Sequence, residues 1–145
     1  MNDLFARYLQ AVETRTQVSP VERFLGTFPV DVGDGFITFE MDVNEAYLNP
    51  QGTLMGGMTS ALADLAMGVA FATTLEEGET FTTIELKVNF MKPVWNGTIR
   101  AEGKVMKRGK TIGLSTCDIY DGAGSLIAYG TSTCMALRGE KAQGR

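Results

Sequence analysis

Residues 53–75 carry a single charged side chain, Asp64, in a run that is otherwise apolar or small. Apolar residues recur in this run at the spacing of one helix face, which predicts a helix over residues 57–75: Met58, Leu62, Leu65 and Val69. Because such a helix is apolar nearly all round, most of its surface has to be buried. The rest of the chain therefore has to fold around it.

A run of this length could also cross a bilayer. Its glycines, its hydroxyl side chains, Asp64 and the lack of basic flanks argue against that alternative. The first residues, MNDLFARYLQ, lack the basic start and apolar run of a signal peptide. We therefore expect a cytoplasmic protein with no membrane partner. Two cysteines, Cys117 and Cys134, are too few for a disulfide framework and are interpreted as small core residues.

The sequence after residue 79 alternates with the two-residue period of β-strands. We expect strands over residues 80–91, 98–106, 111–120 and 126–137, and an earlier hairpin over 30–43. In the first of these strands, simple alternation separates two faces. One face holds Thr82, Ile84, Leu86, Val88 and Phe90, and the other holds Thr83, Glu85, Lys87 and Asn89. A slip in the apolar alternation between Leu114 and Cys117 predicts a β-bulge there.

The 145 residues fit one α+β domain, in which one long helix packs against an antiparallel sheet. Residues 1–23 are expected to form a short helix, capped by Asn2, and a loop. Residues 138–145 are expected to be a frayed polar tail. One helix covers only part of one face of such a sheet. We therefore expect self-association, as a homodimer or as a homotetramer built from two dimers.

The glycine pair Gly56-Gly57 stands at the predicted helix start, and Asp64 follows Gly56 by eight positions. A helix N-terminus exposed by glycine can stabilise an oxyanion, and a carboxylate in an apolar setting can act as a base or nucleophile. The structural alternatives are a tight helix start for the glycines, and a local partner such as Ser60 for Asp64. These alternatives stay open at the level of the residues alone.

The chain contains no histidine, which excludes Ser-His-Asp and Cys-His catalysis and any zinc site with a histidine ligand. A net charge of −4 shows no electrostatic footprint of a nucleic-acid-binding protein. The sequence also lacks a glycine-rich phosphate loop and a cluster of metal-ligating residues. We expect no cofactor, no metal and no nucleic acid partner.

Residues 24–137 resemble the hot-dog-fold thioesterases, in particular the phenylacetate-degradation-type (PaaI-like) acyl-CoA thioesterases. The resemblance rests on an ordered series of short motifs: Asn49 with Gly52, Gly56-Gly57 with Asp64, the segment TIELKVNF at 83–90 with Pro93 and Gly97, Arg108-Gly109-Lys110, and Asp121 with Gly124. It implies a five- or six-stranded antiparallel sheet wrapped around one central helix. It also implies hydrolysis of an acyl-CoA to a free acid and coenzyme A.

Four positions carry over from this resemblance as catalytic. Asp64 resembles the catalytic carboxylate, acting as nucleophile or general base. Gly56 resembles the residue whose N–H polarises the thioester carbonyl. Asn49 resembles the side chain that orients the water or the carbonyl, with an ordinary turn former as the alternative. Thr83 stands where a Ser or Thr contributes from the facing subunit, and a plain strand residue is nearly as good an interpretation.

Further positions are expected to bind substrate. Met55 and Gly57 flank Gly56, and the family usually has a histidine where this chain has Met55. Arg108 and Lys110 flank a glycine at a hairpin tip and are candidates for the coenzyme A phosphates, with a solvated turn as the alternative. An acyl-CoA thioesterase is thus the main hypothesis. The other is a catalytically weak acyl-CoA or acyl-ligand binding protein on the same scaffold, which Met55 favours.

Overall fold

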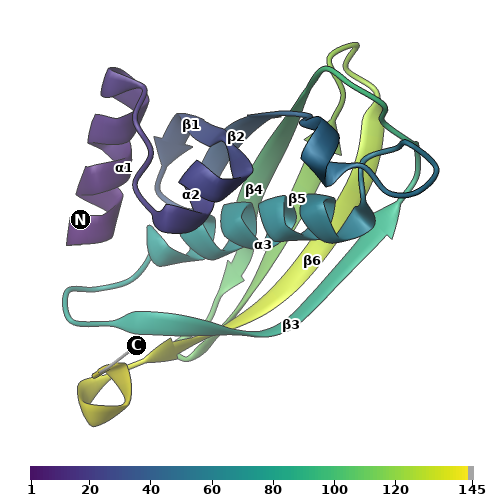
Figure 1. Cartoon of the computed structure of the whole chain (residues 1–145). Helices are drawn as coiled ribbons and strands as arrows, with labels where there is room; N and C mark the ends of the chain where they lie inside the picture. The colour runs from purple at the N-terminus through teal and green to yellow at the C-terminus, as the bar shows by residue number, and fades with distance from the viewer. Residues whose placement is uncertain (144–145) are drawn as a thin grey trace.

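The computed structural model describes residues 1–143, and its main feature is a six-stranded antiparallel sheet curled around one long helix (Figure 1). The strand order in the sheet is β1-β2-β4-β5-β6-β3. The strands are β1 (Thr27–Gly33), β2 (Phe36–Asp42), β3 (Thr80–Phe90), β4 (Thr98–Arg108), β5 (Ile112–Tyr120) and β6 (Leu126–Leu137). The helices are α1 (Asp3–Thr14), α2 (Pro20–Leu25), α3 (Gly56–Ala72) and the short 3-10 turns η1 (Glu45–Tyr47) and η2 (Gly139–Ala142). The expected α+β class is confirmed.

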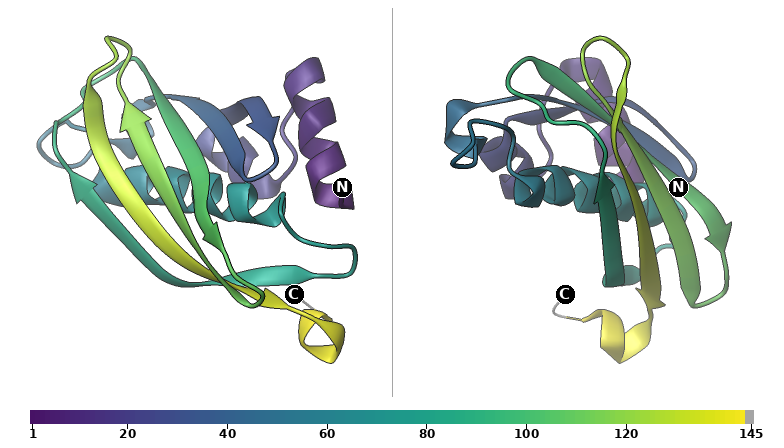
Figure 2. Two further views of the ribbon diagram at one scale, coloured as in Figure 1. Left: turned by 180° about the vertical axis from the view of Figure 1, so that it is seen from behind. Right: turned by 90° about the vertical axis from the view of Figure 1, so that its right-hand side faces the viewer.

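Helix α3 lies across the concave face of the sheet and packs against β2, β3, β4, β5 and β6 (Figure 2). The predicted helix over 57–75 is confirmed, although it begins one residue earlier and ends three residues earlier than expected. Its fully buried residues face the sheet, among them Leu62, Ala63, Ala66, Met67 and Ala70. Within residues 1–143, no helix is long and apolar enough to cross a bilayer.

The helix approaches the sheet so closely that two inward-facing strand positions admit only glycine. A Cβ atom at Gly103 on β4 would lie 2.6 Å from the carbonyl carbon of Ala66 on α3. A Cβ atom at Gly113 on β5 would lie 3.0 Å from Cδ2 of Phe71. At Gly103 the backbone of α3 is therefore seated directly on the sheet, whereas at Gly113 the ring of Phe71 occupies the space that a strand side chain would need.

The N-terminal segment is tied to the end of α3 by one side chain. Asn2 caps α1 by accepting a hydrogen bond from the Phe5 N–H at 2.9 Å, which confirms its predicted capping role. The same side chain donates to the carbonyls of Ala72 and Leu75, both at 2.8 Å. Ala72 is the last residue of α3 and Leu75 lies three residues beyond it, so Asn2 supplies a donor at a helix end whose carbonyls lack partners within the helix. One residue thus caps two helices.

Two details of register differ from the predictions. In β3 the bulge at Ile84 inserts one residue between the pairs Thr83–Cys134 and Glu85–Thr133. Thr83 therefore faces α3 together with Leu86, and its predicted place on the opposite face with Glu85 is wrong. The reason is that an extra residue reverses the phase of a two-residue alternation.

The prediction of a bulge in β5 is also wrong, because the extra residue lies in the neighbouring strand β4. Met106 of β4 stands between the pairs Val105–Ser115 and Lys107–Leu114, so β5 itself alternates without a break. Leu114 faces outward and is exposed. At the C-terminus, residues 139–142 form the η2 turn where a frayed tail was expected, and residues 144–145 lie outside the described residues.

We expect Gly103→Ala to destabilise the protein by about 1–3 kcal/mol, because its methyl group would overlap the Ala66 carbonyl. Urea unfolding should show a lower midpoint with an unchanged slope. Gly122→Ala is the matched control, since a Cβ atom there would lie 3.7 Å from its nearest neighbour, the Thr98 carbonyl oxygen. Equal midpoints for the two variants would contradict the close approach of α3 to the sheet.

Candidate active site

The start of α3 opens into a hollow of about 360 Å³. Asn49, Gly56 and Phe90 line it, together with Thr53, Leu54, Thr59, Met91, Lys92, Pro93, Val94 and Ile127. Met55 is the N-cap residue, and its side chain makes no capping bond. As the first residue of the helix, Gly56 has no carbonyl within the helix to which its N–H can donate. A slightly larger hollow, of about 420 Å³ between α1 and β1–β2, is lined by none of the expected site residues.

The ring of Phe90 covers the Cα side of Gly56. A Cβ atom at Gly56 would lie 2.9 Å from Cζ of Phe90, so a larger side chain requires the ring to move. Phe90 ends β3 and is 56% exposed, which leaves the ring room to shift. The glycine therefore keeps the backbone N–H of the helix start accessible beside an aromatic wall.

Asn49 holds the loop that precedes the helix. Its side-chain oxygen accepts from the N–H groups of Gln51 and Thr53, at 3.0 and 3.1 Å, and its amide nitrogen donates to the Thr53 hydroxyl at 2.9 Å. Gly52 in the same turn has a φ of 80°, a backbone conformation that favours glycine. Asn49 thus lines the hollow, and its polar atoms already serve its own turn.

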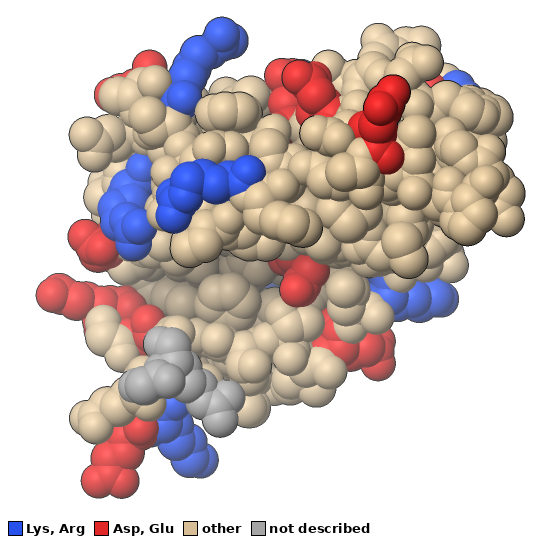
Figure 3. Space-filling view, viewed as in Figure 1, with Lys and Arg blue, Asp and Glu red and all other residues tan. Residues whose placement is uncertain are grey.

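Asp64 is half-buried on α3, and its Oδ1 accepts a hydrogen bond of 3.2 Å from the Thr83 hydroxyl on β3. Among the described residues this bond comes from Thr83 and not from Ser60, the local partner considered above. The surface is hollowed along the line between α3 and β3 (Figure 3), where the two side chains meet. The bulge at Ile84 is what turns Thr83 toward Asp64.

The helix start and the carboxylate are not side by side within one chain. Asp64 follows Gly56 by eight residues, and at 1.5 Å per residue this places them about 12 Å apart along the axis of α3. A reacting carbonyl group has to lie roughly 3 Å from both its donor and its attacking group. A single chain therefore supplies two half-sites and no complete site.

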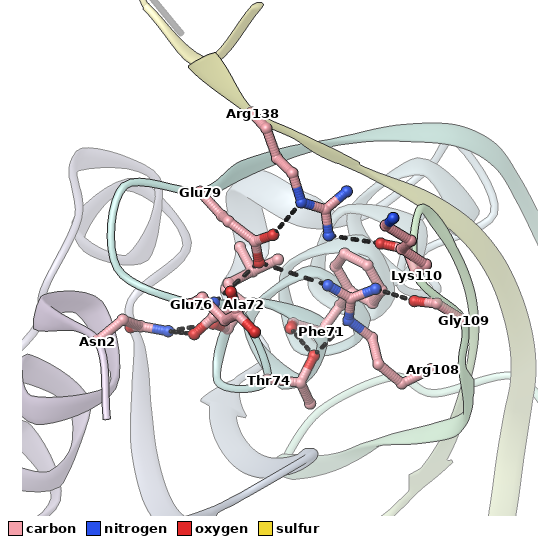
Figure 4. Close-up of polar contacts among 11 residues, drawn as sticks. Asn2, Phe71, Ala72, Thr74, Glu76, Glu79, Arg108, Gly109, Lys110 and Arg138 are labelled. Atoms are coloured by element: carbon pink, nitrogen blue, oxygen red, sulfur yellow. Dashed lines mark hydrogen bonds and ion pairs between the residues drawn. The ribbon is translucent and has the colours of Figure 1, made fainter.

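Arg108 and Lys110 lie at the opposite end of α3 (Figure 4). The Arg108 guanidinium lies 4.9 Å from the centre of the Phe71 ring and donates to the Thr74 hydroxyl at 3.1 Å. It also forms an ion pair of 3.5 Å with Glu79. Phe71 follows Gly56 by 15 residues, which is about 22 Å along the helix.

The surroundings of the two cations differ. Glu79 is nearly buried and pairs with Arg138 as well as with Arg108, so the two guanidinium groups share its one negative charge. The Lys110 side chain is exposed, and its carbonyl accepts from Arg138 (Figure 4). The structure thus does not bring either cation to Gly56 or Asp64 within one chain.

Another cation, Lys92, stands at the rim of the hollow beside Gly56. Its ammonium group lies 2.7 Å from Asp121, and this hydrogen bond is the main reason that the pKa of Asp121 lies below its usual range. Within residues 1–143, no group of three His, Cys, Asp or Glu side chains is arranged to hold a metal ion.

Sequence reasoning missed the contacts of three residues, two of them near Gly56 and Thr83 and one at the opposite end of α3. Phe90 was placed on a strand face, but its contact with Gly56 depends on where β3 ends. Cys134 was interpreted as a plain core residue, yet it pairs in register with Thr83. Glu79 stood in an acidic turn, and only the tertiary structure brings the two arginines to it. The lone Asp64 was the one local signal for this region.

Comparison with known proteins shows the family of the chain. Residues 51–128 match the Thioesterase superfamily. The human protein acyl-coenzyme A thioesterase 13 is 32% identical over 127 residues, which cover 86% of this chain and 90% of that protein.

Solved structures agree with this match. A thioesterase family protein from Silicibacter pomeroyi has a TM-score of 0.80 and 32% identity, and the likeness covers 91% of this chain and 99% of that one. The PaaI protein of the E. coli phenylacetic acid degradation operon has a TM-score of 0.81 over 94% and 98% of the two chains, at 22% identity. The second likeness shows the shared fold. The chain belongs to the thioesterase superfamily, with the hot-dog fold that the sequence motifs indicated.

Proposed function

We propose that this protein hydrolyses acyl-CoA thioesters, with Asp64 as the attacking or proton-accepting group. The observation that carries the proposal is the hydrogen bond from Thr83 to Asp64 in the groove between α3 and β3. This bond joins the Asp64 carboxylate, which lies in an apolar helix, to the Thr83 hydroxyl on β3. The family resemblance predicts a Ser or Thr hydroxyl at this strand position. The relative named acyl-coenzyme A thioesterase 13 supports coenzyme A as the thiol of the substrate.

A second copy of the chain would complete the site. β3 is an edge strand of 11 residues that pairs with β6 on one side and has no strand on the other within the described chain. Ile84, Leu86 and Phe90 are exposed along it. A long apolar edge of this kind favours pairing with another strand. Two copies joined at β3 would set Asp64 and Thr83 of one chain against the Gly56 N–H of the other. The distance of about 12 Å between Gly56 and Asp64 of the same chain would then not separate the two groups that act on one substrate.

The chemistry then follows from the two half-sites. The Gly56 N–H donates to the thioester oxygen as it becomes negative. Asp64 either takes a proton from a water that attacks the carbonyl carbon, or attacks that carbon itself to form an anhydride that water then cleaves. In both routes the C–S bond breaks, the oxygen of water ends in the carboxylic acid product, and coenzyme A leaves as the thiol.

The remaining candidates take supporting roles in this proposal. Asn49 keeps the loop beside Gly56 in place and presents its side chain to the hollow. Met55 and Gly57 border the bound acyl group. Lys110, which is exposed, is better suited to a phosphate of coenzyme A than Arg108, whose charge is already paired with Glu79.

Asp64→Asn keeps the shape of the side chain and removes its charge. We expect kcat to fall by about a hundredfold or more, or on the order of 3 kcal/mol in barrier, with acyl-CoA binding largely kept. Asp31→Asn, on the exposed face of β1, is the control and should retain the parent rate. Near-normal turnover by purified Asp64→Asn would overturn the role of Asp64. A parent that binds a panel of acyl-CoAs without hydrolysing any would favour the binding-protein alternative.

Gly56→Pro should remove the proposed oxyanion donor while leaving the helix intact. Proline is well tolerated at the first helical position, and Met55 before it already has the extended backbone that proline requires (φ −64°, ψ 133°). We expect kcat to fall by about 10²–10³. Gly56→Ala places a similar Cβ atom against Phe90 but keeps the N–H, so it should retain far more activity. Equal losses in the two variants would assign the effect to Phe90.

Mixing the two inactive variants tests whether the site is shared between chains. Random pairing of Asp64→Asn and Gly56→Pro chains gives heterodimers in which one site combines an intact Gly56 with an intact Asp64. We therefore expect subunit exchange to restore about a quarter of the parent activity. Two sites each built within one chain would give no restoration, and sedimentation should show the active species to be at least a dimer.

Met55→His introduces the histidine that the family usually has. We expect a gain in kcat of about threefold to tenfold, on the order of 1 kcal/mol, because the parent lacks a donor to the carbonyl or water at this position. Met55 is 54% exposed beside Gly56, so the imidazole ring fits without repacking the core. A flat or lowered rate for every acyl-CoA in a panel would instead indicate a pocket rebuilt around the thioether.

A further inference from the structure

The hollow beside Gly56 has an apolar interior. Leu54, Val94 and Ile127 line it and are only 9%, 7% and 3% exposed. Backbone hydrogen bonds hold these segments in place: the Leu54 N–H donates to the Val94 carbonyl at 2.7 Å, and the Met91 N–H donates to the Ile127 carbonyl at 2.8 Å. The interior therefore has a fixed shape and offers apolar surface to an alkyl group.

Phe90 is the aromatic side chain of this lining, and its ring rests against Gly56. A Cβ atom at Gly56 would lie 2.9 Å from Cζ of the ring and 3.2 Å from both Cε atoms. These three atoms are the far end of the ring, so Phe90 meets Gly56 with its tip. The cross-strand partner of Phe90 on β6 is Ala128, whose side chain is too small to take the place of the ring.

The ring tip lies close to the group that is proposed to bind the thioester oxygen. An N–H···O hydrogen bond is about 2.9 Å long and a C=O bond about 1.2 Å, so a carbonyl carbon held by the Gly56 N–H lies within about 4 Å of that nitrogen. The nitrogen is bonded to the Cα atom against which the ring rests. Of the whole acyl group, the carbon next to the carbonyl is therefore the one that comes within reach of the ring.

A ring tip in this place acts on the width of the acyl group and not on its length. One CH₂ group beside the carbonyl can pass the ring, whereas a second substituent on the same carbon would overlap it. Carbons further along the chain lie beyond the ring. Phe90 and Gly56 belong to the same chain, so this relation does not depend on how a second copy docks.

We propose that Phe90 makes the site selective for acyl groups that are unbranched at the carbon next to the carbonyl. The effect on hydrolysis rests on the function proposed for Asp64 and Gly56, whereas the effect on binding of the acyl group does not. The two effects can therefore be measured separately.

The test compares isomeric substrates, which contain the same atoms and differ only in the place of a branch. We expect the kcat/KM of the parent to be at least about tenfold higher for butanoyl-CoA than for 2-methylpropanoyl-CoA. Phe90→Ala should lower this ratio to about twofold by raising the rate for the branched isomer, with Phe90→Leu between the two. The intrinsic reactivity of the isomers cancels when parent and variant ratios are compared.

Two controls accompany this test. Hexanoyl-CoA and 4-methylpentanoyl-CoA differ in a branch far from the carbonyl, and their ratio should be the same in the parent and in Phe90→Ala. Phe24→Ala removes a ring that is 71% exposed on α2 and does not line the hollow, and it should keep the parent ratios for both pairs. An unchanged butanoyl ratio in Phe90→Ala, or an equal change for both isomeric pairs, would overturn the proposal.

Binding separates this proposal from the proposed hydrolysis. Calorimetric titration of Asp64→Asn with butanoyl-CoA and 2-methylpropanoyl-CoA should give a Kd ratio that favours the unbranched isomer, and adding Phe90→Ala should reduce it. A parent that shows this discrimination in Kd but hydrolyses neither isomer would overturn the proposed function alone. A parent that neither binds nor hydrolyses either isomer would overturn both.

Discussion

The direct contact between the backbone of α3 and the sheet determines the layout of the molecule. The Ala66 carbonyl rests against Gly103, and Phe71 packs over Gly113, so the helix cannot shift along or away from the strands without losing buried contacts. Protein interiors are packed closely enough that gaps of this size are costly. Because the axis of α3 is held in this way, the positions of its first residue and of Asp64 relative to β3 are held as well.

Because α3 is held in place, the distance between Gly56 and Asp64 is fixed within one chain. On one helix, eight residues correspond to about 12 Å, and no side-chain rotation closes that distance. The carboxylate instead faces the open edge of β3, where Thr83 meets it. The open edge, the exposed apolar side chains along it and the incomplete site within one chain all favour a second copy at the same place. Catalysis and assembly would then depend on the same strand.

Three small polar side chains stand among the buried residues of β5 and β6: Ser115, Ser132 and Cys134. Hydroxyl and thiol groups at positions 115, 132 and 134 stand where a sheet that only had to bury apolar surface would carry Val or Ile. Ser115 shows that this composition has a cost, since its buried hydroxyl has no hydrogen-bond partner among the described residues. Buried polar groups without a partner destabilise a protein.

The sequence by itself determined the class of the fold and the family of the chain. An apolar run with one charge can only be a buried helix in a protein of this composition, and the two-residue alternation located every strand to within a few residues. The lone Asp64 and the glycine pair marked the two half-sites, and the motif order indicated the family.

Only the tertiary structure decided which side chains meet. The bulge at Ile84 reverses the face of Thr83, and an inserted residue leaves no reliable mark in an alternating pattern. The pairing of Arg108 with Glu79 and the contact of Phe90 with Gly56 join residues 29 and 34 positions apart. The periodicity of apolar residues predicts which face of its own helix or strand a side chain occupies. Distances between elements depend on how closely the backbones pack, and here that was set by single glycines against α3.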